Sequence, residues 1–243
     1  MKNWQIVGIA TGLALQAIAG QAATMLTPTP SEWASWPSFC RAKYAYLRNE
    51  LASQFTPRVT QAEISQFESS MGKTWIYVHH YCASLLYWQQ ANIALTPKER
   101  GLRLKQATDE GLFTFVRIPT ESAIYAEIAT HLGTVARAEN DPQSAERYFE
   151  IARTTHPDYP GGYQGLALLL EDKGNSAAAR DILLEGNKAT DGKSPEIHYF
   201  LGLVYVKLKN LDDAVVHARL AYQLGYPLPG LQQKLEAAGR SLD

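Results

Sequence analysis

Apolar residues recur along most of this chain at helical spacing, and no segment shows the alternation that is typical of a strand. Residues 38–54 have apolar side chains on one face of a predicted helix. Thr60 and Glu63 have the spacing of a capping box, which predicts a second helix that ends near Met71. The apolar positions of the first helix are Phe39, Ala42, Tyr46 and Leu47.

Two longer helices are expected next. An aromatic-rich apolar run predicts a helix over residues 75–95. Thr96 and Pro97 then begin a helix that runs towards Val116. Near the other end of the chain, residues 229–242 predict a short amphipathic helix. Its inward-facing residues would be Leu231, Leu235 and Ala238.

Residues 126–228 repeat themselves with a period of 34 to 35 residues, in three units that begin at Ala126, Pro160 and Pro195. Each unit has a small residue at its eighth place and an alanine at its twentieth, where helix backbones can approach closely. A polar cap or a proline lies at the start of each second helix, near Asp141, Asn175 and Asn210. The small residues are Gly133, Ala167 and Gly202 in the first helices and Ala145, Ala179 and Ala214 in the second helices.

This pattern resembles the tetratricopeptide repeat family, in which pairs of helices stack. The units depart from it at the fourth place, where the expected aromatic residue is Ala129, Tyr163 and His198 in turn. The resemblance implies an all-α protein with a right-handed helical solenoid, a helical N-terminal extension and a C-terminal capping helix. The expected boundaries are 33–125 for the extension, which includes a degenerate repeat-like helix pair, 126–159, 160–194 and 195–228 for the repeats, and 229–243 for the capping helix.

In this family the first helices line a concave groove that binds other proteins. The resemblance therefore implies a non-catalytic scaffold or adaptor with its partner-binding residues at the matching places. The lining lacks the set of lysine, arginine and asparagine residues with which chaperone-binding members hold a carboxylate, so that partner class is disfavoured. The implied lining consists of Glu127, Thr130, His131, Thr134, Arg137, Gln164, Leu168, Glu171, Asp172, Glu196, Tyr199, Phe200, Leu203 and Val206.

The apolar end of this lining allows two interpretations. Tyr199, Phe200, Leu203 and Val206 could anchor an apolar helix or strand of a partner. Alternatively, the terminal helix folds back and covers these four residues, as end helices of solenoids do.

Residues 1–22 have the features of an export signal, because Lys2 precedes an apolar run that ends at Ala19 and small residues follow. Cleavage after Ala22 fits this pattern best, and cleavage after Ala19 is the second choice. An uncleaved anchor is the alternative, although the run is shorter than the ~20 residues of a spanning helix. The mature protein is then expected in the periplasm or outside the cell, with no membrane span and with a flexible lead over residues 23–32.

Cys40 and Cys82 are the only cysteines, and an exported chain reaches an oxidising compartment. A disulfide between them is therefore expected. The alternative is a metal site that includes His79 and His80, but neighbouring helix positions point in different directions and metal ligands must converge. No metal and no other cofactor is expected.

The composition disfavours two other classes of function. The 243 residues are 46% hydrophobic and carry a net charge of −1, so the chain can bury a core but has no basic surface for nucleic acid. Ser70 and Lys73 match the Ser-x-x-Lys pair of penicillin-binding proteins, but the companion motifs of that chemistry do not occur. No catalytic residue is therefore predicted.

The combined expectation is an adaptor that binds one or more proteins of a cell-envelope complex. The alternative is an accessory subunit that binds a ligand or glycan for an envelope enzyme or a polysaccharide export system. That second function would use the aromatic helix between Trp75 and Trp88.

Overall fold

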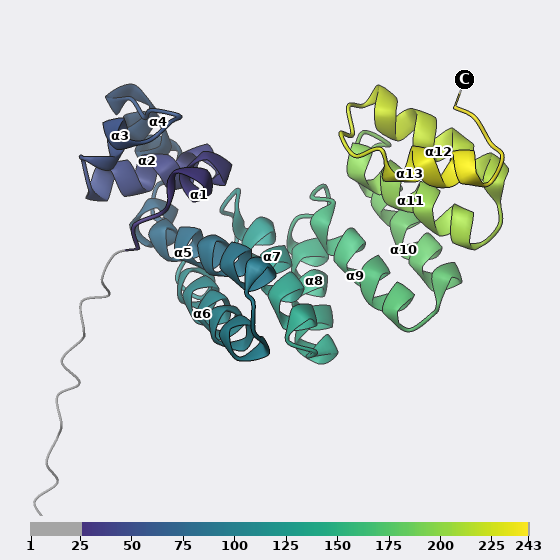
Figure 1. Cartoon of the computed structure of the whole chain (residues 1–243), viewed down its shortest axis with the longest axis horizontal. Coiled ribbons are helices and arrows are strands. Elements are labelled where there is room, and N and C mark those ends of the chain that lie inside the picture. Colours follow the sequence, from purple (N-terminus) through teal and green to yellow (C-terminus); the bar gives the residue numbers. More distant parts are fainter. Residues whose placement is uncertain (1–25, 243) are drawn as a thin grey trace, which may run out of the picture.

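The computed structural model describes residues 26–242, and these residues form helices without strands (Figure 1). The helices stack in pairs along a curved row, with α1–α4 at one end and α13 at the other (Figure 1). The export signal predicted over residues 1–22 lies outside the described residues. The helices are α1 (Pro30–Ser35), α2 (Ser38–Leu47), α3 (Leu51–Gln54), α4 (Gln61–Met71), α5 (Thr74–Ile93), α6 (Pro97–Phe115), α7 (Tyr125–Ala138), α8 (Pro142–Thr155), α9 (Gly161–Asp172), α10 (Ser176–Ala189), α11 (Pro195–Lys207), α12 (Leu211–Gln223) and α13 (Gly230–Ala237).

No helix in the described part of the chain is suited to crossing a membrane. None of the helices within residues 26–242 combines the length and the apolar character that crossing a bilayer requires.

The three predicted starts of the second helices are confirmed. The side chains of Asp141, Asn175 and Asn210 each accept a hydrogen bond from the backbone N–H three residues later, at 3.0 to 3.3 Å. Each bond satisfies a backbone donor that the first turn of a helix leaves unpaired. The residue before each cap has a left-handed backbone, which turns the chain back sharply between the paired helices. These residues are Asn140, Gly174 and Lys209, with φ of 62°, 74° and 60°.

One aromatic ring fills the space where the first two repeats meet. Phe149 of α8 is buried between α7 and α9. A Cβ atom added to Gly133 would lie 2.6 Å from the Phe149 ring, and one added to Gly165 would lie 2.1 Å from it. Both helices can therefore approach the ring only because these positions lack a side chain. The sequence pattern identified Gly133 but not Gly165.

The predicted capping helix is present as α13, which is shorter than the sequence pattern indicated. Leu231 and Leu235 are fully buried against the last repeat. A Cβ atom at Gly202 of α11 would lie 2.4 Å from Leu231 Cδ2, so α13 packs where a further first helix would follow. The helix thereby covers the apolar end of the stack, as a solenoid requires.

The helix pair α5 and α6 continues the stack on the other side of the repeats. A Cβ atom at Gly111 of α6 would lie 2.9 Å from Leu132 Cδ2 of α7 and 3.0 Å from Ser84 Oγ of α5. Ala107 of α6 is fully buried. The pair therefore packs on the first repeat as a preceding unit.

The N-terminal extension differs from the sequence-based expectation in two respects. The single helix predicted over residues 38–54 is wrong, because the backbone leaves the helical region at Arg48 (φ −138°, ψ 86°) and separates α2 from α3. The lead expected to be flexible up to residue 32 is helical from Pro30. Thr29 and Glu32 form a capping box there, which the sequence pattern had not revealed.

Cys40 of α2 and Cys82 of α5 are fully buried and lie in bonding position, as predicted, with their Cα atoms 5.5 Å apart. The bond joins α2 to α5, the first helix of the stack. Within residues 26–242, no group of three or more histidine, cysteine, aspartate or glutamate side chains comes together to hold a metal ion.

Gly165→Ala should lower the free energy of unfolding by about 1–3 kcal/mol, because the added methyl group would overlap the Phe149 ring. Urea denaturation would measure the change. Gly101→Ala is the matched control: no atom lies within 4 Å of the added Cβ in α6. That control should gain about 0.5–1 kcal/mol from helix propensity alone. Equal effects of the two substitutions would contradict the packing described for Phe149.

Reduction of the disulfide should destabilise the N-terminal extension. The bond closes a loop with a sequence separation of 42 residues, which corresponds to about 4 kcal/mol in the chain-entropy model. Thermal unfolding with and without a reducing agent would show a lower transition for the reduced protein. A Cys40→Ser, Cys82→Ser double variant should unfold at that lower temperature in both conditions, and an unchanged transition would oppose this role.

Candidate functional site

The first helices of the repeats, α7, α9 and α11, lie next to one another, and α5 precedes them in the stack (Figure 1). We call the surface formed by α7, α9 and α11 the first-helix face. These three helices carry every lining residue that the resemblance implied. The side chains on it fall into three groups: those bonded within the chain, those covered by other elements, and those left without a partner.

Two ion pairs cross the first-helix face near the C-terminal ends of its helices. Arg137 of α7 holds Asp172 of α9 through two bonds, Nε to Oδ2 at 2.5 Å and Nη2 to Oδ1 at 2.8 Å. This contact holds the pKa of Asp172 below its usual value. Lys207 of α11 forms an ion pair with Glu171 of α9. Arg137 and Glu171 were predicted to contact a partner, but both charges are already neutralised by neighbouring repeats.

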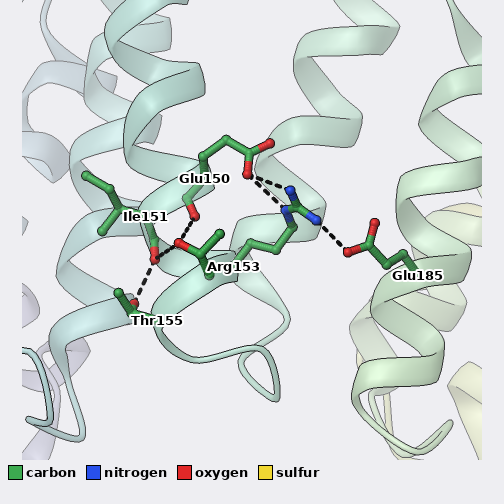
Figure 2. Close-up of polar contacts among 6 residues, drawn as sticks. Glu150, Ile151, Arg153, Thr155 and Glu185 are labelled. Atoms are coloured by element: carbon green, nitrogen blue, oxygen red, sulfur yellow. Dashed lines mark hydrogen bonds and ion pairs between the residues drawn. The ribbon is translucent and has the colours of Figure 1, made fainter.

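A second ion-pair network joins the second helices, on α8 and α10 (Figure 2). Arg153 donates to Glu150 Oε2 from Nε at 3.0 Å and from Nη2 at 2.7 Å, and to Glu185 Oε1 from Nη1 at 2.5 Å. The sequence analysis did not identify this network. Exposed pairs of this kind contribute about 0–1 kcal/mol each, so their main effect is to fix the register of adjacent units.

His131 is buried, with 8% of its surface exposed, and does not line the face as predicted. The edges of its ring contact Tyr81 and Trp88 of α5. Its Nε2 lies 2.8 Å from Ser84 Oγ, and that hydroxyl lies 2.5 Å from the Ala107 carbonyl oxygen. Because a carbonyl only accepts, the Ser84 hydroxyl donates to Ala107 and His131 Nε2–H donates to Ser84. His131 is buried because it contacts the preceding helix pair, α5 and α6, which is not part of the repeat pattern.

Glu127 lies one turn before His131 at the start of α7. It accepts a hydrogen bond from Tyr81 Oη of α5 at 2.9 Å. Burial raises the pKa of the Glu127 carboxyl, although the Tyr81 hydrogen bond opposes this effect. Glu127 is partly buried, so it remains a side chain of the face.

The middle of the face holds polar atoms without partners. Thr130 Oγ1 of α7 and Gln164 Nε2 of α9 are buried at the fifth place of their units and have no hydrogen-bond partner. Thr134 Oγ1 nearby donates to the Thr130 carbonyl at 2.9 Å and is therefore satisfied. Leu168 is half-buried beside them on α9. Buried polar atoms are normally paired, so these two positions suit a partner that supplies hydrogen bonds.

The C-terminal end of the face is partly covered by the chain itself. Tyr199 is 8% exposed, and its ring stacks on Tyr226 with the centroids 4.1 Å apart. The prediction that Tyr199 is free to contact a partner is therefore wrong, because the segment between α12 and α13 covers it. The alternative, in which the terminal helix covers all four residues, is met only in part, because the ring that covers Tyr199 is that of Tyr226, which precedes α13. Phe200, Leu203 and Val206 are only half-buried and stay on the face.

The other candidate sites do not assemble. Trp75 is buried, with 4% exposed, and Lys43 lies over its ring, so the ring offers no stacking surface to a sugar. Ser70 Oγ donates to the Phe67 carbonyl at 3.4 Å, and no hydrogen bond within the described residues joins it to Lys73. Both residues line a cavity of about 600 Å³ between the end of α4 and the segment before α7.

No protein-family model matches this chain, and no curated protein matches its sequence. Among solved structures, it is similar to "YrrB: a TPR protein with an unusual peptide-binding site", at 16% identity and a TM-score of 0.45 over 82% of this chain and 88% of that chain. Two structures of MamA are 17% and 14% identical, with TM-scores of 0.42 and 0.43. They cover 66% and 79% of this chain, and 83% and 94% of MamA.

Acid should destabilise the protein through His131. Burial lowers the pKa of His131 to about 4, while an unfolded histidine has a pKa near 6.5. The unfolded state therefore binds more protons, and stability falls as the pH drops from about 6.5 towards 4. Through this histidine alone, the free energy of unfolding should fall by about 2 kcal/mol between about pH 7 and about pH 5. Denaturation at both pH values would show a smaller loss for His131→Gln, and an equal loss would refute its buried neutral state.

Proposed function

We propose that this protein is a non-catalytic scaffold that binds a protein partner through the first-helix face, within an assembly of the cell envelope. The observation that carries the proposal is the pair of unpartnered buried atoms, Thr130 Oγ1 and Gln164 Nε2, next to the half-buried Leu168. A polypeptide supplies hydrogen-bond donors and acceptors from its backbone and an apolar contact from its side chains, all in the same stretch. It is therefore the kind of ligand that would satisfy this surface.

The envelope location rests on two features. The export signal predicted over residues 1–22 would deliver the chain to an oxidising compartment. The buried Cys40–Cys82 pair suits such a compartment, because it lies in bonding position between two helices. Both features agree with a periplasmic or secreted protein.

A leucine-to-aspartate substitution on the face tests this function. Leu168→Asp would place a charge beside the unpartnered polar atoms and should reduce recovery of a crosslinked partner by about tenfold or more. The measurement is crosslinking in intact cells followed by affinity purification of the tagged protein. Leu168 is a better probe than Tyr199, because a Tyr199 substitution would disturb the packing of Tyr226.

Leu184→Asp is the matched control, since Leu184 lies on the second helix α10 and is 39% exposed. It should leave partner recovery unchanged. Circular dichroism would verify that both variants keep the helical content of the wild type. A partner recovered equally with both variants would contradict binding through the first-helix face.

A further inference from the structure

The charges of the first-helix face are unevenly compensated. Arg137 and Lys207 neutralise Asp172 and Glu171 at the C-terminal end of the helices. At the opposite end, Glu127 on α7 and Glu196 on α11 occupy the second place of the first and third repeats. Among the described residues, neither of these two carboxylates forms an ion pair. Glu127 accepts only from Tyr81, and Glu196 bonds to Ser194 Oγ at 2.9 Å.

The charges of both carboxylates act on one tyrosine, Tyr159. Tyr159 lies two residues before the first residue of α9, and a Cβ atom at Gly161 would lie 2.6 Å from its ring and 2.8 Å from the side chain of Thr130. The ring therefore rests on the start of α9 against α7. Burial raises the pKa of the Tyr159 phenol, and the charges of Glu127 and Glu196 raise it further, which places both carboxylates within its electrostatic reach.

An arrangement of this kind favours a cation. Burial penalises the ionised form of Glu127, and the hydrogen bond from Tyr81 compensates only in part. A positive charge nearby would stabilise the carboxylate, and the negative face of an aromatic ring adds to the attraction. Arg137 lies ten residues further along α7, about 15 Å away along the helix axis, and is held by Asp172. No residue in the described part of the chain forms an ion pair with Glu127, so this cation is left for a partner to supply.

The cavity of about 600 Å³ reaches Ile124, the N-cap residue of α7, which lies three residues before Glu127. Its apolar wall also includes Phe39 and Met71. Phe39 stacks on the buried Tyr81 with ring centroids 6.4 Å apart, and the hydroxyl of Tyr81 donates to Glu127. Tyr81 thus contacts both a wall residue of the cavity and the carboxylate of Glu127. The volume lies within the range of clefts that hold ligand groups, about 300–1,000 Å³.

We propose that this end of the first-helix face binds a partner segment that carries a lysine or arginine next to a large apolar side chain. The cation pairs with Glu127 beside Tyr159, and the apolar side chain enters the cavity lined by Phe39, Met71 and Ile124. This inference rests on the proposed function and adds the chemistry of the partner. Neither the contacts within the chain nor the repeat pattern implies this chemistry of the partner.

The test uses a random peptide library displayed on phage and selected against the full, disulfide-bonded chain. Peptides selected by the wild type should contain lysine or arginine adjacent to leucine, phenylalanine or a similar side chain. The affinity of one selected peptide is then measured by calorimetry for the wild type and for Glu127→Gln, which keeps the Tyr81 hydrogen bond but removes the charge. Affinity should fall about tenfold or more.

The matched control is Glu146→Gln, at an exposed glutamate of α8 that lies away from the face. It should bind the peptide as the wild type does. A peptide analogue with norleucine in place of lysine should bind the wild type weakly. It should bind the Glu127→Gln variant at least as well as the parent peptide binds that variant. That loss of preference would show that the lysine and Glu127 act on each other.

The possible failures are distinguishable. Selected peptides without a basic residue, or equal affinity for the wild type and Glu127→Gln, would overturn the inference. If Leu168→Asp still abolishes their binding in that case, the proposed function stands without it. If the wild type selects no peptide, or if Leu168→Asp binds the peptides as well as the wild type does, both proposals fail.

Discussion

The contact of Phe149 with two glycines is the constraint on which the stack depends. The ring occupies the volume that side chains at Gly133 and Gly165 would fill, so α7 and α9 are held at the distance that the ring sets. Interiors are close-packed, and such a contact transmits position from one helix to the next. The same principle recurs at Gly186, where an added Cβ would lie 2.7 Å from Tyr163. Spacing between neighbouring helices of the stack thus follows from rings packed on glycines.

Once the helices are fixed at that spacing, polar side chains of one first helix meet polar side chains of the first helix in the next repeat. Arg137 and Asp172 lie 35 residues apart in sequence, and Glu171 and Lys207 lie 36 apart. Such partners neutralise each other and leave little charge for another molecule. On the surface that we propose binds the partner, Thr130 Oγ1 and Gln164 Nε2 consequently have no hydrogen-bond partner, and Glu127 has no ion pair.

Local signals predicted the fold of the repeats well, because caps, small residues and apolar spacing each depend on a few neighbouring residues. The second-helix caps and the buried alanines follow that rule. Exposure within the lining was harder to predict, since His131 and Tyr199 are covered by α5 and by the segment at Tyr226. Those contacts join parts of the chain outside the repeat pattern. A family position gives the direction of a side chain, but the neighbouring elements decide whether solvent reaches it.

The positions of Glu127 and Glu196 have one explanation that needs no partner. Both lie in the first turn of a helix, where the macrodipole stabilises a carboxylate by about 0.3–1 kcal/mol. That amount is sufficient for Glu196, whose carboxylate also bonds to Ser194. For Glu127, burial raises the pKa, and the hydrogen bond from Tyr81 opposes this effect only in part. The cation recognition that we propose therefore depends on Glu127 more than on Glu196.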